Sequence, residues 1–99
     1  MKDTTNTDNQ IILLSNGRYA LSGILDYVRY VVQDRIPSLS HDGTYTLRQI
    51  IGEENWNDLS SMNKIEAGWC MIHLVARGEL PMISVNKCRH QSPKKYRLK

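Results

Sequence analysis

Turn and helix-stop residues divide this chain into short segments, and this division constrains its fold more than any other feature. Asn16-Gly17 is a strong hairpin-turn signal, because both residues tolerate positive φ. Pro37 ends a helix because its ring removes a backbone N–H group. Gly52 and Gly78 suit the left-handed position at a helix end, and Pro81 prevents the preceding helix from continuing. The chain is therefore expected to fold from several short helices and strands.

The first part of the chain predicts a hairpin and one amphipathic helix. Residues 1–9 are polar and predict a disordered leader. Residues 10–14 and 18–21 flank the first turn and predict its two strands. Ser22 suits an N-cap, and apolar residues follow it at helical spacing. These apolar residues are Ile24, Leu25, Val28, Val31, Val32 and Ile36.

Two short helices are predicted after the loop that follows Pro37. Thr46 and Gln49 fit the capping-box pattern, in which each side chain bonds the other residue's backbone N–H group. The helix that they open is expected to end at Gly52. Residues 53–59 predict a second short helix, whose acidic start suits the helix dipole.

A longer helix is predicted over residues 61–77, with Ser60 or Ser61 as its N-cap. Met71 and Leu74 are expected to leave apolar surface on its outward side. The stripe expected to be buried comprises Met62, Ile65, Trp69, Ile72 and Ala76.

The last segment predicts two strands, over residues 82–85 and 95–98, joined by a loop. The residues expected to give these strands an apolar face are Ile83, Val85, Tyr96 and Leu98. The sequence thus predicts a single mainly helical α+β domain over residues 10–99. Its parts are a hairpin and helix over residues 10–43 and a second unit over residues 44–99.

Charge is segregated along the chain. Residues 1–86 hold ten acids and seven Lys or Arg, a net charge of −3, whereas residues 87–99 hold six Lys or Arg and no acid. Such asymmetry is typical of a protein with an anionic partner. The alternative is a basic tail that only improves solubility.

From Thr46 onward, the order short helix, short helix, longer helix, strand, basic loop, strand resembles the winged helix-turn-helix superfamily. The resemblance covers residues 44–99 and rests on element order, caps and the basic hairpin. It implies that residues 61–77 form a recognition helix in the major groove of duplex DNA. It also implies that residues 87–95 form a wing that touches phosphates. The small size, with an added hairpin and helix, is similar in style to regulators and host-takeover proteins encoded by phages.

The resemblance assigns nucleic-acid contacts to the exposed start of the long helix and to the basic hairpin. Asn63 is a candidate to read adenine, while the basic residues of the hairpin neutralise phosphates and release counterions. Glu66 would repel phosphate, so the recognition pattern is only half met. The candidate residues are Asn63, Lys64, Lys87, Arg89, His90, Lys94, Lys95 and Arg97.

Cys70, His73, Cys88 and His90 are residue types that suit zinc, but their spacing is not that of structural zinc sites. The sequence also lacks a Gly-rich phosphate loop and the HExxH and GxSxG motifs. We therefore expect no metal, no cofactor and no enzymatic activity. Two cysteines without an export signal indicate reduced thiols in a cytoplasmic protein.

Two functions remain open at this stage. The first is a small nucleic-acid-binding regulator that binds duplex DNA through the long helix and the wing. The second is a protein-interaction module, such as a phage-type inhibitor, whose basic wing docks on an acidic protein surface of a host protein. A homodimer through the first helix is compatible with both. No apolar run approaches the roughly 18 residues needed to span a membrane.

Overall fold

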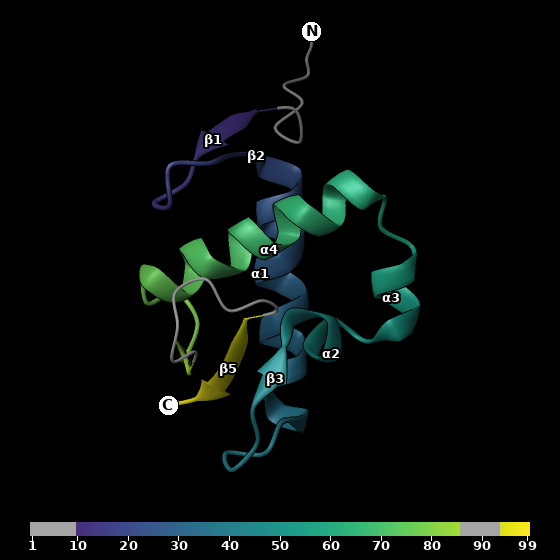
Figure 1. Cartoon of the computed structure of the whole chain (residues 1–99). Coiled ribbons are helices and arrows are strands. Elements are labelled where there is room, and N and C mark those ends of the chain that lie inside the picture. The colour runs from purple at the N-terminus through teal and green to yellow at the C-terminus, as the bar shows by residue number, and fades with distance from the viewer. Residues whose placement is uncertain (1–9, 86–93) are drawn as a thin grey trace, which may run out of the picture.

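The chain folds around two crossing helices, with a small antiparallel sheet on either side of them. The computed structural model describes residues 10–85 and 94–99. In chain order, the described elements are β1 (Ile11–Leu13), β2 (Tyr19–Leu21), α1 (Ser22–Arg35), a 3₁₀ turn (Ile36–Ser38), β3 (Tyr45–Thr46), α2 (Leu47–Ile51), α3 (Glu53–Asn57), α4 (Ser61–Ala76), β4 (Met82–Ser84) and β5 (Lys95–Leu98). The crossing helices are α1 and α4, which pack against each other more extensively than any other pair (Figure 1). The α+β class and the mainly helical character are confirmed.

The N-terminal hairpin forms as predicted. β1 and β2 pair antiparallel, and Gly17 has a φ of 82° in the turn between them. β2 then runs directly into α1, so Ser22 is the first residue of that helix. The prediction that Ser22 is its N-cap is wrong, because Leu21 holds the cap position with no side-chain hydrogen bond. An uninterrupted strand-to-helix connection leaves no separate residue to serve as a cap.

The predicted starts and ends of the C-terminal helices agree with the structure. Thr46 and Gln49 form the reciprocal capping box at the start of α2, and Gly52 ends that helix with a φ of 95°. The Ser60 hydroxyl accepts a hydrogen bond from the Asn63 N–H at 3.1 Å and caps α4. These signals act within a few residues of chain, so the sequence alone predicts them.

The buried face of α4 is the opposite of the one predicted. Its core side chains are Ala67, Cys70, Met71, His73 and Leu74. Met62 and Ile65 were expected to be buried, but they are 60% and 50% exposed, while Leu74 is fully buried. The helix is apolar around most of its circumference, so periodicity gives two candidate stripes. Packing on α1 and β2, which periodicity does not reveal, selects between them.

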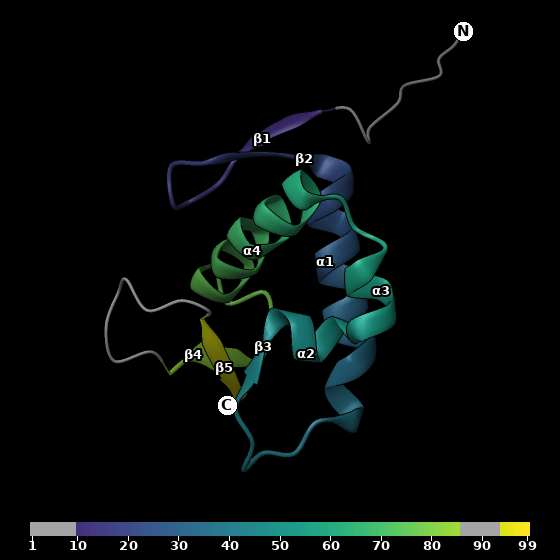
Figure 2. The same ribbon diagram turned by 45° about the vertical axis from the view of Figure 1, so that its right-hand side comes forward.

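The two C-terminal strands belong to a three-stranded sheet rather than an isolated hairpin. β5 lies in the centre, between β3 and β4, and all pairs are antiparallel. Tyr96 and Leu98 are buried as predicted. On β4, however, the core residue is Met82 and not Ile83, because the register places Ile83 opposite the outward-facing Arg97. Both ribbon views place this sheet on one side of α4 and the N-terminal hairpin on the other (Figures 1 and 2).

No helix in the described part of the chain is long and apolar enough to cross a membrane. The predicted leader over residues 1–9 lies outside the described residues.

Candidate nucleic-acid interface

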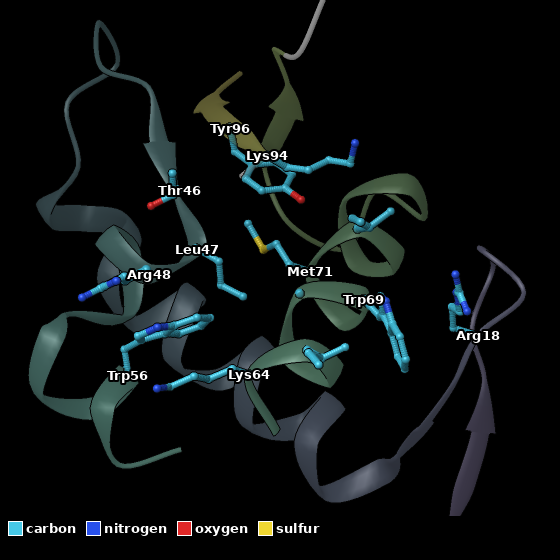
Figure 3. Close-up of a pocket in the computed structure, with 13 residues that line it drawn as sticks. Arg18, Thr46, Leu47, Arg48, Trp56, Lys64, Trp69, Met71, Lys94 and Tyr96 are labelled. Carbon is cyan, nitrogen blue, oxygen red and sulfur yellow. The ribbon is translucent and has the colours of Figure 1, made fainter. Parts of the chain in front are cut away.

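A groove of about 760 Å³ runs over the exposed face of α4 (Figure 3). Its floor is α4, its walls come from α2, α3 and β5, and the N-terminal hairpin reaches it through Arg18. The lining residues are Arg18, Thr46, Leu47, Arg48, Trp56, Lys64, Ile65, Gly68, Trp69, Met71, Ile72, Lys94 and Tyr96. We call this feature the α4 groove.

The floor of the groove follows from helical spacing. Ile65, Gly68, Trp69 and Ile72 recur at steps of three and four, so they share one side of α4. Gly68 stands in the middle of this row, and a Cβ added there would meet no atom within 4 Å. Glycine in a helix interior costs about 0.5–1 kcal/mol relative to alanine. The floor therefore has an open notch at Gly68, although glycine at this position makes the helix less stable than alanine would.

Four basic side chains from separate parts of the chain line the groove around this floor. They are Arg18, Arg48, Lys64 and Lys94, and none of the described lining residues is acidic. Arg48 is partly neutralised, because its Nε and Nη2 donate to the Glu53 carboxylate at 2.6 and 2.7 Å. That hydrogen bond lowers the pKa of Glu53 and raises the pKa of Arg48. The described lining residues thus include basic side chains but no acidic one.

Three aromatic side chains contribute to the same lining. Trp56 and Trp69 are half-buried, and both pack against the hydrophobic core while lining the groove. The Arg18 guanidinium lies over the Trp69 ring, 5.2 Å from its centroid, at a distance typical of a cation–π contact. Tyr96 is buried, and burial raises the pKa of its hydroxyl to about 12. The prediction that Tyr96 packs inward is thus confirmed.

The N-terminal hairpin is held against α4 by its turn residues. The Ser15 N–H donates to His73 Nδ1 at 2.8 Å, and Asn16 Nδ2 donates to the Trp69 carbonyl at 3.4 Å. Asn16 Oδ1 also accepts from the Arg18 N–H at 3.1 Å. His73 therefore accepts at Nδ1, which places the ring proton on Nε2. Through these bonds, a buried histidine on α4 positions the arginine that stands at the groove.

Acidification is expected to loosen the hairpin from α4. Burial lowers the pKa of His73, Arg77 and Arg29 act in the same direction, and Glu79 opposes them. A lowered folded-state pKa gives stability that is present above pH 6.5 and is lost as the pH falls below it. Protonated Nδ1 can no longer accept from Ser15, so we expect a loss of about 1 kcal/mol.

Amide hydrogen exchange at Ser15, measured at pH 7.5 and pH 5, checks this prediction. Protection is expected to fall at pH 5 in the wild type and in His41→Gln, which alters an exposed histidine as a control. The pH dependence should be absent in His73→Gln. Equal protection of the wild-type Ser15 amide at both pH values would contradict the prediction.

The structure brings together only some of the predicted contact residues. Lys64 and Lys94 both line the groove, whereas Lys95 and Arg97 lie on the opposite, exposed face of β5. Asn63 is half-buried in the first turn of α4. Lys87, Arg89 and His90 lie outside the described residues, as does most of the predicted wing. Successive side chains of an extended chain point to opposite faces, so Lys94 lines the groove while its neighbour Lys95 does not.

Sequence reasoning missed the contributions of Arg18 and Arg48 to this site. Each lies more than ten residues from Lys64, on a separate element, so no local spacing connects them. Trp69 was assigned to the buried stripe of its helix, which describes only its inner face. The one available signal was the presence of tryptophan and lysine on the same predicted helix.

The four residues whose types suit zinc are only partly described by the structure. Cys70 is a free, fully buried thiol, and His73 is engaged with the hairpin. Cys88 and His90 lie outside the described residues. Among the residues that the structure describes, no group of three or more potential ligands converges.

Comparisons with protein-family models, with curated proteins and with solved structures find no match to this chain. The functional interpretation therefore depends on the geometry of the α4 groove.

Proposed function

We propose that this chain is a small nucleic-acid-binding regulator. The observation that carries the proposal is the convergence of Arg18, Arg48, Lys64 and Lys94 on one groove, with no acid among its described lining residues. Basic side chains gathered from separate elements match the spaced negative charges of a phosphate backbone. The same lining holds no cysteine, histidine or carboxylate, which favours binding over acid–base chemistry.

The order of elements supports a winged-helix arrangement within this proposal. In such an arrangement, α4 would be the recognition helix, and β4 and β5 would be the strands that flank the wing. The outward side of α4 is largely apolar, with Met62 and Ile65 exposed, so few groups are available to read base edges. We infer that phosphate contacts supply most of the affinity, with duplex DNA among the expected ligands.

A salt titration tests the proposal. Because Arg48 is already paired with Glu53, we count about three neutralised phosphates, for which affinity falls about 20-fold for a single strand, and about 40-fold for a duplex, between 50 and 200 mM salt. Fluorescence anisotropy of labelled DNA, both duplex and single-stranded, measures this slope. Lys64→Gln combined with Lys94→Gln should weaken binding and reduce the slope. Lys99→Gln, at an exposed base that does not line the groove, serves as the matched control.

Two results would contradict this function. One is the absence of binding to any DNA at low salt, and the other is binding that does not change with salt. A slope equal to that of the wild type in the double variant would instead place the contacts elsewhere on the protein.

Exposed apolar side chains favour a second candidate function, a protein-interaction module. Met62 and Ile65 project from α4, and the outer face of the hairpin exposes Ile11, Leu13 and Tyr19. Large exposed apolar side chains that cluster in this way mark many protein contact surfaces. Capture of an acidic protein that survives nuclease treatment and is lost on Ile65→Ser would support this candidate. Sedimentation at two concentrations would test the homodimer.

A further inference from the structure

We infer that the α4 groove binds unpaired nucleotides, so that its ligand is single-stranded nucleic acid rather than a duplex. The inference rests on the proposed nucleic-acid function and specifies the form of the ligand. Three features carry it: the concave shape of the site, its half-buried tryptophans and the notch at Gly68.

The shape of the site excludes paired bases from its floor. A recognition helix reads a duplex by projecting into a major groove about 12 Å wide. The exposed side of α4 instead forms the bottom of a groove, with α2 and α3 on one side and β5 on another (Figure 3). A volume of about 760 Å³ is in the range that holds a ligand of one or two nucleotides. Unpaired bases can enter such a space, whereas bases inside a double helix cannot.

The aromatic lining supplies the surfaces that unpaired bases use. Trp56 and Trp69 line the groove from two different helices, and Lys64 lines the same groove (Figure 3). Stacking on aromatic side chains contributes to single-strand binding whatever the sequence, because every base has a π face. Arg18 already lies over Trp69 and adds a cation close to that ring. An alternation of aromatic and basic groups along one groove is typical of single-strand binding sites.

The notch at Gly68 provides the closest approach to the helix. Among the described residues, no atom outside the adjacent helix backbone lies within 4 Å of a Cβ built at this position. Gly68 lies one residue before Trp69 and four after Lys64, between a stacking surface and a phosphate-binding cation. A base seated over Gly68 would contact the helix backbone, with its ring beside Trp69 and its phosphate towards Lys64. Helix stability does not explain a glycine at this position, whereas contact with a base would give this glycine a function.

Gly68 also offers the sharpest test, because a larger side chain there would extend from an open position into the groove. We expect Gly68→Leu to keep the fold, since leucine favours helices, and to block the ligand site. Gly68→Ala is the graded variant, because it improves the helix and fills the notch with only one methyl group. Circular dichroism and thermal melting establish that both variants fold.

The ligands for the test are labelled oligothymidine of twelve nucleotides, a duplex of the same length and a glutamate-rich amphipathic peptide. The full chain should bind oligothymidine at least about tenfold more tightly than the duplex and show quenched tryptophan fluorescence. Gly68→Leu should lose about tenfold in oligothymidine affinity, and Gly68→Ala, which blocks only the backbone contact, should lose a smaller part of it.

Three outcomes would overturn the inference. Duplex binding as tight as single-strand binding, without tryptophan quenching, overturns it while leaving the nucleic-acid function intact. Unchanged oligothymidine affinity in a folded Gly68→Leu variant moves the single-strand site away from the groove. Binding of the acidic peptide alone, with no DNA bound at low salt, overturns the inference and the nucleic-acid function together.

Discussion

Leu74→Ala is expected to lower the free energy of unfolding by about 2–5 kcal/mol. Leu74 is fully buried on the side of α4 that faces the core. Truncation there removes apolar contacts and leaves a cavity that a close-packed interior fills only in part. For a domain whose total stability is about 5–15 kcal/mol, this loss brings the protein close to unfolding.

The matched control is Ile65→Ala on the opposite side of the same helix. Ile65 is 50% exposed, so its truncation leaves no enclosed cavity, and we expect a loss below about 1 kcal/mol. Urea denaturation, followed by far-ultraviolet circular dichroism, gives both values. If Ile65→Ala proves the more damaging variant, the helix faces are reversed and the α4 groove does not exist as described.

This pair of variants addresses the point at which sequence reasoning failed. The sequence of α4 places apolar residues on more than one side, and periodicity cannot choose between them. The choice depends on α1 and β2, which come from the other half of the chain and pack against α4. The reversed face also explains why the groove was not predicted, since its floor is the stripe that was assigned to the core.

The features that the sequence did predict depend on short-range chemistry. The hairpin turn at Asn16-Gly17, the capping box of Thr46 and Gln49 and the left-handed Gly78 each follow from the preferences of a few adjacent residues. β3 was not predicted, because its formation depends on a long-range contact. It has only two residues, and it forms because β5 provides a partner about fifty residues further along the chain.

The candidate site likewise combines residues that local sequence patterns predict with a residue that only a long-range contact brings in. Lys64 and Lys94 were predicted as contacts from their place in the helix and the basic hairpin, and both line the groove. Arg18 joins them only because His73 and Trp69 hold the hairpin turn against α4. That contact spans more than fifty residues of sequence, so no pattern within one element predicts it.

The second large effect is expected in alkaline solution, where the chain should lose stability steeply above pH 9. Cys70 is fully buried, and burial, reinforced by the Glu66 carboxylate, raises the pKa of its thiol from 9.0 to about 12. Burial also raises the pKa of Tyr96 from 10.0 to about 12. In both cases the folded state keeps a proton that the unfolded chain releases at lower pH. Stability is therefore complete below pH 9 and falls as the pH rises towards 12.

The size of this alkaline effect follows from the two shifts. Each pKa unit corresponds to 1.36 kcal/mol, so Cys70 accounts for about 4 kcal/mol across pH 9 to 12 and Tyr96 for about 3 kcal/mol across pH 10 to 12.

Urea denaturation at pH 7.5, 9, 10 and 11 measures how steeply the free energy of unfolding falls with pH. Cys70→Ala should start from a lower stability at pH 7.5, because it removes buried volume, yet decline less steeply. Tyr96→Phe keeps the ring and should flatten only the part above pH 10. A wild-type slope retained in both variants would mean that neither group is ionised by unfolding, and that the core around α4 and β5 is more open to water than the structure shows.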